Sequence, residues 1–195
     1  MINIAVIVGS TRPNRKAETV AQWVFKIAGA RSDARFEIVD LADYRLPLLD
    51  EAAPASFGRY AHTRAWAETI ARFDGFVFVT PEYNHGPPAA LKNALDFLFH
   101  EWADKAAGFV SYGGLGGVRA VERLRLILAE LQVAAVRTQV GLSLFTDFEH
   151  FTTFAPTERH AASVAAMLDQ LVPWARALRQ VRSERAAAPG QFAHA

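Results

Sequence analysis

The sequence predicts an α/β fold in which five parallel strands form the central layer of a three-layer α/β/α sandwich. Short apolar runs alternate five times with stretches whose apolar residues recur at helical spacing, which is the pattern of repeated strand-helix units. The run 75–80 is apolar at nearly every position, as expected for a central parallel strand buried on both faces. Five strands in 195 residues fit the order 2-1-3-4-5 better than the six-stranded dinucleotide-binding order.

The first half of the chain contains two strand-helix units and an irregular connection. An apolar run comes first, and the helix after it is marked by apolar spacing and by Gly29 near its end. The predicted elements are a strand over 2–8, a helix through Val20, Trp23, Val24, Ile27 and Ala28, a strand over 36–41 and a helix over 61–70. The proline-bearing segment 46–51 is expected to connect them irregularly.

The second half continues the alternation. The third helix is expected to begin near Pro87 and Pro88, because proline suits the first turn of a helix. The predicted elements are a strand over 75–80, a helix through Leu91, Ala94, Leu95, Leu98 and Phe99, a strand over 107–112, a helix through Val118, Val121, Leu124, Leu128 and Leu131, a strand over 133–142 and a helix over 156–181. Pro173 could kink this last helix. We expect one domain over 1–185 and a disordered tail over 186–195.

Composition narrows the function classes. The formal net charge is +1 and no cysteine is present, so neither nucleic-acid binding nor a membrane surface is indicated and thiol chemistry is excluded. No apolar stretch reaches the roughly 18 residues of a membrane span, and the start of the chain lacks a signal-peptide core. We therefore expect a cytoplasmic protein whose partner is a small molecule.

The segment 9–16, directly after the first strand, is the first candidate binding loop. It combines a glycine, hydroxyl groups and three cations ahead of a helix N-terminus, whose free N–H groups favour an anion. Asn14, Arg15 and Lys16 stand where a Walker A loop needs glycine, lysine and serine or threonine. Thr11 and Asn14 likewise replace two glycines of a dinucleotide fingerprint. A solvated polar turn is the alternative, but position at a strand end favours a phosphate ligand.

Two further loops fall at the predicted topological switch point. Residues 80–87 follow the third strand, and the glycine-rich segment 111–117 follows the fourth. Glycines let a backbone approach a planar ligand closely, although a flexible loop or a helix start explains the same letters. Arg119 stands where a dinucleotide fingerprint would need its third glycine, so that reading is rejected.

Together, three motifs in order resemble the NADPH-dependent FMN reductase family of flavodoxin-like quinone, azo-dye and chromate reductases. The motifs are Gly9-Ser10-Thr11-Arg12, then Pro81-Glu82-Tyr83-Asn84 leading into 90–96, then Ser111-Tyr112-Gly113-Gly114 with 117–120. The resemblance covers about Met1 to Leu142 and implies a flavodoxin-like fold with bound FMN.

The resemblance also implies which residues surround the cofactor. Ser10, Arg12, Arg15, Lys16 and the N–H groups around Ala17 would hold the FMN phosphate. Pro81, Glu82, Tyr83 and Asn84 would run along the ring edge, and Ser111, Tyr112, Gly113 and Gly114 would flank the ring and ribityl chain.

The implied activity is NADPH oxidation, with NADH possible, and ping-pong transfer of two electrons to a small acceptor. A quinone, an azo dye, free flavin or chromate would serve as that acceptor. No obligate catalytic side chain is expected, because the cofactor does the chemistry. Glu82, His85 and Tyr112 are placed to assist protonation, although Glu82 fits a solvated loop acid or an interface partner equally well. No histidine has the spacing of a metal ligand.

Two other functions fit the same sequence, and a partner chain is also expected. A flavodoxin-type electron carrier would share the fold and cofactor without oxidising nicotinamide, and a flavin-free scaffold would share the fold alone. Ala90 and Phe97 fall off the apolar face of the third helix, so a second protein is expected to cover them. Related flavoproteins dimerise there, which implies a homodimer, with a tetramer as an extension.

Overall fold

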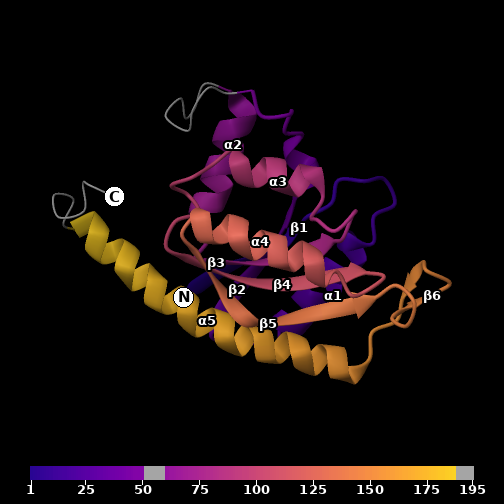
Figure 1. The fold of residues 1–195 in the computed structure, drawn as a ribbon. Helices are drawn as coiled ribbons and strands as arrows, with labels where there is room; N and C mark the ends of the chain where they lie inside the picture. The colour runs from indigo at the N-terminus through magenta and orange to yellow at the C-terminus, as the bar shows by residue number, and fades with distance from the viewer. Residues whose placement is uncertain (51–59, 188–195) are drawn as a thin grey trace.

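The computed structural model describes residues 1–50 and 60–187, and its central layer is a parallel β-sheet (Figure 1). The five strands are β1 (Ile2–Val8), β2 (Ala34–Asp40), β3 (Gly75–Pro81), β4 (Lys105–Gly113) and β5 (Val133–Ser143). Their order is β2-β1-β3-β4-β5, with every neighbouring pair parallel. The predicted fold class and strand order are confirmed.

Helices cover both faces of this sheet. One face carries α1 (Ala17–Ala28) and α5 (Glu158–Ala187), and the other carries α2 (Ala61–Ala71), α3 (Ala89–Asp96) and α4 (Val118–Glu130). The alternation of side chains along β1 separates the two cores: Ile4 and Val6 face the first pair of helices, whereas Ala5 and Ile7 face the other three. The central strands β3 and β4 are buried at every position, as a doubly covered parallel sheet requires.

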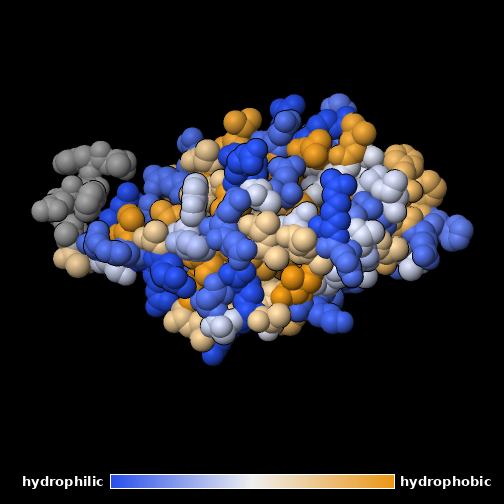
Figure 2. Space-filling view, turned by 90° about the horizontal axis from the view of Figure 1, so that it is seen from below, coloured by the Kyte–Doolittle hydropathy of each residue, from blue (hydrophilic) through white to orange (hydrophobic). Residues whose placement is uncertain are grey.

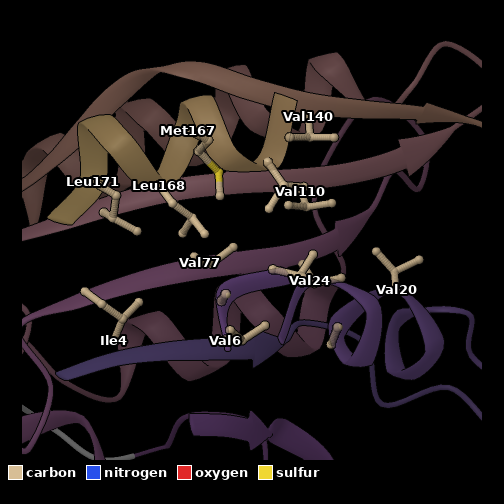
Figure 3. Close-up of a cluster of buried hydrophobic side chains, with 14 of the residues drawn as sticks. Ile4, Val6, Val20, Val24, Val77, Val110, Val140, Met167, Leu168 and Leu171 are labelled. Carbon is tan, nitrogen blue, oxygen red and sulfur yellow. The ribbon is translucent and has the colours of Figure 1, made fainter. Parts of the chain in front are cut away.

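The core beneath α1 and α5 is built from branched aliphatic side chains (Figure 3). Val24 of α1 and Met167 of α5 meet Val77 and Val110 of the sheet, and all four are fully buried. Gly108 makes room for this packing, because a Cβ there would lie 2.8 Å from the Met167 sulfur. The long helix α5 is thereby seated on the strands and continues beyond the sheet near the N-terminus (Figure 1).

The opposite core is aromatic. Trp102 packs edge-on against Phe76, with ring centroids 4.9 Å apart, and against Trp66 at 5.9 Å. Each indole N–H donates to a carbonyl of α3, Trp66 to Ala94 at 2.8 Å and Trp102 to Leu95 at 3.1 Å. These bonds satisfy buried donors and fix α3 over β1 and β3, next to the strand ends that carry the candidate loops.

Several predicted boundaries move. Strand β2 is shifted to 34–40, since the Asp40 carboxylate accepts the Ala42 N–H at 2.9 Å and caps a 3₁₀ helix, η1 (Leu41–Tyr44). Helix α3 ends at Asp96, so Leu98 and Phe99 lie beyond it. Helix α5 runs unbroken through Pro173 to Ala187. Ala186 and Ala187 are thus helical, whereas the remainder of the predicted tail, 188–195, and Glu51 of the irregular connection lie outside the described residues.

Phe97 corrects the sequence-based argument for a partner chain. It follows the last residue of α3 and is only 3% exposed within this single chain, where its ring lies edge-on to His62 at 5.7 Å. Ala90 is half-buried on the first turn of α3. The apolar residues beyond the main stripe of α3 are therefore covered by the chain itself and do not require a second protein.

A small antiparallel hairpin, absent from the predicted elements, lies between β5 and α5. Its strands are β6 (Phe148–Glu149) and β7 (Thr153–Phe154). The face over α5 is largely hydrophilic, and tan side chains gather toward the end of the molecule that carries the hairpin (Figure 2). Phe145 and Phe151 are 68% and 56% exposed there, which makes this end unusual for a surface.

Candidate functional site

A cleft opens where β1, β3 and β4 end, at the point where the strand order reverses. In doubly wound sheets this switch point is where ligands bind. The cleft brings together all three predicted loops and one later segment: it is lined by Arg12, Pro13, Asn14, Arg15, Lys16, Pro81, Glu82, Tyr83, Tyr112, Gly113 and Leu144.

Ser10 and Arg12 of the first loop contact Tyr83 of the third-strand loop. The Ser10 hydroxyl lies 3.3 Å from the Tyr83 hydroxyl, and the Arg12 guanidinium carbon lies 5.6 Å from the centre of the tyrosine ring. The Ser10 hydroxyl also accepts the Arg12 N–H at 3.5 Å. A cation stacked on an aromatic ring is held in place but keeps its donors for an anion. These contacts join two loops that lie more than 70 residues apart.

The N-terminus of α1 forms one end of the cleft. Lys16 is its N-cap residue, and its side chain makes no capping bond. The Ala17 N–H faces the phenol oxygen of Tyr112; burial raises the pKa of Tyr112, and this hydrogen bond only partly offsets the rise. Tyr112 therefore keeps its proton at neutral pH, and its O–H can donate a hydrogen bond to an acceptor beside the helix end.

Arg15 differs from the other two cations. Its guanidinium donates to the Asp40 carboxylate at 2.6 Å, pairs with Glu18, and has a side chain only 12% exposed. The charge is thus already balanced by two carboxylates. Arg15 lines the cleft, but it is not a spare cation for a second phosphate such as the 2′-phosphate of NADPH.

Residues 83–86 form a tight turn at the edge of the cleft. Tyr83 and Gly86 exchange both backbone hydrogen bonds, at 2.9 and 3.1 Å. Asn84 and His85 have φ values of 49° and 66°, the geometry of a type I′ turn, in which glycine is favoured at the position of His85. Both side chains are exposed, and Asn84 does not line the cleft.

Glu82 lies beside the cleft, but its carboxylate points to α4. One oxygen accepts the Arg119 N–H at 3.0 Å, and the other accepts Arg119 Nε at 2.6 Å. Arg119 in turn lies 2.7 Å from His85 Nε2, which must accept because a guanidinium only donates. Burial raises the pKa of Glu82, but the bonds from Arg119 and from the Ala120 N–H outweigh it and lower that pKa. Glu82 is therefore ionised at neutral pH, and its carboxylate is directed toward α4.

The glycine-rich loop divides into two parts. Gly113 lines the cleft, whereas Gly116 and Gly117 have φ values of 70° and 73°. A Cβ on Gly117 would lie 2.8 Å from that of Ser111, so glycine is required there by the chain itself. The Ser111 hydroxyl is buried and donates to the Gly116 carbonyl at 2.7 Å. Ser111 and exposed Gly114 thus do not line the cleft.

Arg119 and Leu144 have roles that the sequence did not predict. Arg119 stood out only within a family motif and as the residue that breaks a dinucleotide fingerprint, because its partner Glu82 lies 37 residues away. Leu144 lines the cleft because its N–H donates to the Gly113 carbonyl at 3.0 Å, which ties the end of β5 to the end of β4. A lone leucine after a strand carries no signal that would distinguish it from core.

Within 1–50 and 60–187, no helix is both long and apolar enough to span a membrane. Those ranges also contain no cluster of three or more side chains suited to a metal ion.

Comparison with known proteins agrees with the architecture of the cleft. The family model for NADPH-dependent FMN reductases matches residues 2–147. An NAD(P)H-dependent FMN reductase of Schizosaccharomyces pombe is 43% identical over 148 residues, covering 74% of each chain. A 2-hydroxy-1,4-benzoquinone reductase of a Burkholderia species is 34% identical over 139 residues, covering 68% of this chain and 73% of its own.

Solved structures show the same fold. The flavoenzyme NAD(P)H:(acceptor) oxidoreductase FerB from Paracoccus denitrificans superposes with a TM-score of 0.72 at 21% identity, covering 90% of this chain and 98% of its own. The family match includes all three loops that line the cleft, and the curated relatives span most of the chain. The chain belongs to the NADPH-dependent FMN reductase family, oxidoreductases that use FMN and a reduced nicotinamide.

Proposed function

We propose that the protein oxidises NAD(P)H and passes two electrons to a small acceptor, most often a quinone, in two successive half-reactions at the cleft. The observation that carries this is the end of α1: the side chain of its N-cap residue Lys16 makes no capping bond, and Arg12 and Lys16 flank this helix end at the switch point. Such an end binds a phosphate through its free N–H groups and its dipole. The proposed compartment is the cytoplasm, where reduced nicotinamide is available.

The donors around the cleft fit the phosphate of FMN. Arg12 offers a planar guanidinium, Lys16 a point charge, and Ser10 and Tyr112 offer hydroxyl groups, while the Ala17 N–H is already bonded to Tyr112. Arg15, neutralised by Asp40 and Glu18, would act by holding the loop in shape. Bound FMN supplies a ring that accepts hydride from nicotinamide and returns electrons to an acceptor.

The ring would lie between the two remaining loops. Pro81, Tyr83 and the backbone of the 83–86 turn form one wall, and Tyr112 and Gly113 form the other, with Ser111, Gly114 and Glu82 supporting these walls from behind. No side chain of the described cleft is assigned a proton-transfer step. The chain thus orients the reactants, and proton uptake by the reduced acceptor comes from solvent.

The experiment compares Arg12→Gln with Arg123→Gln, which removes an exposed arginine of α4. We expect wild type to retain FMN through dialysis and to oxidise NADPH when a benzoquinone is added. Loss of one charge-assisted fork should weaken FMN binding about ten- to a hundred-fold in Arg12→Gln, whereas Arg123→Gln binds like wild type. Both are measured by quenching of flavin fluorescence.

Two outcomes would contradict the proposal, and each would assign a different function. A yellow protein that leaves NADPH unoxidised with quinone, ferricyanide and oxygen would be a flavodoxin-type electron carrier. A protein that stays colourless after FMN addition and dialysis would be a flavin-free scaffold.

We also propose a homodimer, and its support now comes from α4. Leu115, Val118 and Leu126 are 65%, 39% and 72% exposed on this helix and the loop before it. Three large, exposed apolar side chains favour a second copy as their cover. Light scattering after size exclusion should give twice the chain mass, or four times for a tetramer; a monomer would remove the proposal.

A further inference from the structure

A second hollow lies on the other side of the first loop, away from the cleft. It encloses about 210 Å³ and is lined by residues from three elements, including Thr11, Leu41, Arg45, Leu46, Asn93 and Ala94. Thr11 lines this hollow and Arg12 lines the cleft, so the two spaces are separated by consecutive residues of one loop. A ligand extended across this loop would reach both.

The floor of the hollow is apolar and its outer wall is tied down. Leu41 and Ala94 are buried beneath it, at 3% and 1% exposure. Asn93 of α3 donates to the Pro47 carbonyl at 2.7 Å and accepts the Leu49 N–H at 2.9 Å. These bonds fasten the segment after η1 to α3, so the hollow is formed before any ligand arrives.

Arg45 stands at the rim in an unusual backbone state. It is the C-cap of η1 with φ 47° and ψ 41°, a conformation that costs a non-glycine residue free energy and often marks a site of function. Its side chain is exposed, and no described residue forms an ion pair or hydrogen bond with it, whereas Arg15 is held by two carboxylates. Arg45 therefore offers an uncompensated guanidinium above an apolar floor.

We propose that this hollow binds the adenosine 2′-phosphate end of NADPH, with Arg45 pairing the 2′-phosphate and the apolar floor receiving the adenine ring. The inference rests on the proposed function, since it assigns the far end of the same nicotinamide substrate. A guanidinium fork matches a phosphate dianion in geometry and charge. NADH lacks that phosphate, so Arg45 sets the preference between the two nicotinamides.

Binding of a fragment tests the site without turnover. The probe is adenosine 2′,5′-bisphosphate, compared with adenosine 5′-monophosphate, titrated calorimetrically into FMN-loaded protein. We expect the bisphosphate to bind ten- to a hundred-fold more tightly to wild type. In Arg45→Gln the two fragments should bind alike. Arg35→Gln is the matched control, because Arg35 stands opposite Asn3 in the register of β1 and β2, at the other end of these strands. This variant should leave both affinities unchanged.

Steady-state kinetics supply the second readout. The ratio of kcat/KM for NADPH to that for NADH should fall about ten-fold or more in Arg45→Gln, through KM for NADPH, and stay at the wild-type value in Arg35→Gln. An unchanged ratio in Arg45→Gln, or equal binding of both fragments to wild type, overturns the inference while the proposed function stands. Tight, Arg45-dependent binding of the bisphosphate by a protein that never oxidises NADPH would instead overturn the proposed function alone.

Discussion

Glu82 joins the turn after β3 to the start of α4 through both of its carboxylate oxygens. It thereby acts as a capping side chain for α4. Its negative charge accepts hydrogen bonds from free N–H groups and lies at the positive end of the helix dipole. Arg119 completes the contact from the side and reaches His85 in the type I′ turn. One buried carboxylate thus fixes the position of a wall of the cleft.

Replacing Glu82 by glutamine should destabilise the protein in a pH-dependent way. The carboxylate titrates below its ordinary value in the folded state, so its contribution is complete above about pH 4.5 and is lost as pH falls further. We expect Glu82→Gln to lower the free energy of unfolding by about 1.5–3 kcal/mol at pH 7, measured by urea denaturation. The difference from wild type should shrink toward pH 3.

The control for this experiment is Glu122→Gln, because Glu122 is an exposed residue of α4. Equal losses in the two variants, or a Glu82→Gln effect that does not depend on pH, would show that the contact contributes no charge-specific stability.

The sequence predicted which charged residues lie in each loop, but not which side chains they contact. The first loop was identified from its cations, yet Asp40, which neutralises Arg15, lies 25 residues away on another strand. Glu82 was assigned to the cofactor because its neighbours match the family motif, while its carboxylate is bound by α4. Sequence position fixes which loop a charge belongs to; only the fold decides which opposite charge it meets.

At the scale of elements, the hairpin β6–β7 is the part of the fold that the sequence did not predict. Asp147 organises its approach: the carboxylate accepts the Ser143 N–H at 2.7 Å and lies 3.6 Å from His160 Nε2 at the start of α5. This leaves Phe145 and Phe151 exposed with their rings edge-on at 5.6 Å. A Cβ on Gly114 would lie 3.4 Å from the Phe145 ring, so Phe145 lies against the glycine-rich loop and directly follows Leu144 of the cleft.

We expect this pair to favour apolar, aromatic acceptors. Phe145→Ser combined with Phe151→Ser should raise KM for a naphthoquinone about ten-fold, since each phenyl ring offers apolar area and stacking. KM for ferricyanide and for NADPH should stay within two-fold. Leu48→Ser, which removes an 81% exposed side chain from the segment after η1, is the matched control. A similar rise for naphthoquinone and ferricyanide would assign the pair a structural role instead.

The long elements were predictable because their patterns are redundant. Each of β1, β3 and β4 is a run of apolar residues, and α1 and α4 repeat apolar residues at helical spacing, so local errors move only the boundaries. The two-residue strands of the hairpin carry no such periodicity. Phe148 and Phe154 lie opposite each other in the hairpin. In the sequence, however, three aromatic residues within seven positions are equally compatible with a core segment, a loop or a helix.

At the scale of the whole molecule, the two ends of the sheet differ in chemistry. The ends that carry the cleft present cations to a ligand, whereas the opposite ends bury a network of charges around Asp74 and Lys105. The Arg182 guanidinium donates to Asp74 at 2.5 Å, and the Lys105 ammonium donates to the Ile70 carbonyl at 2.7 Å, at the C-terminus of α2. These contacts tie α2 and α5 to the sheet far from the chemistry.

Lys105 makes the stability of the whole fold depend on pH in the neutral to alkaline range. Burial, together with the nearby Arg182, lowers its pKa from 10.5 to about 7, although Asp74 and Glu101 act in the other direction. Between pH 7 and about 10 the unfolded chain holds a proton on this lysine that the folded chain has released. Because the unfolded state binds more protons, stability must rise with pH across that window.

The test is equilibrium unfolding in urea at pH 7, 8 and 9 for wild type and Lys105→Met. For wild type we expect the free energy of unfolding to gain up to about 1.4 kcal/mol per pH unit from this one proton. Lys105→Met has nothing to titrate there, so its profile should be flatter by that amount, whatever its stability at pH 7. Lys26→Met removes an exposed lysine of α1 and should keep the wild-type slope. A Lys105→Met profile parallel to wild type would mean that Lys105 stays charged when buried, stabilised by the helix carbonyls and Asp74.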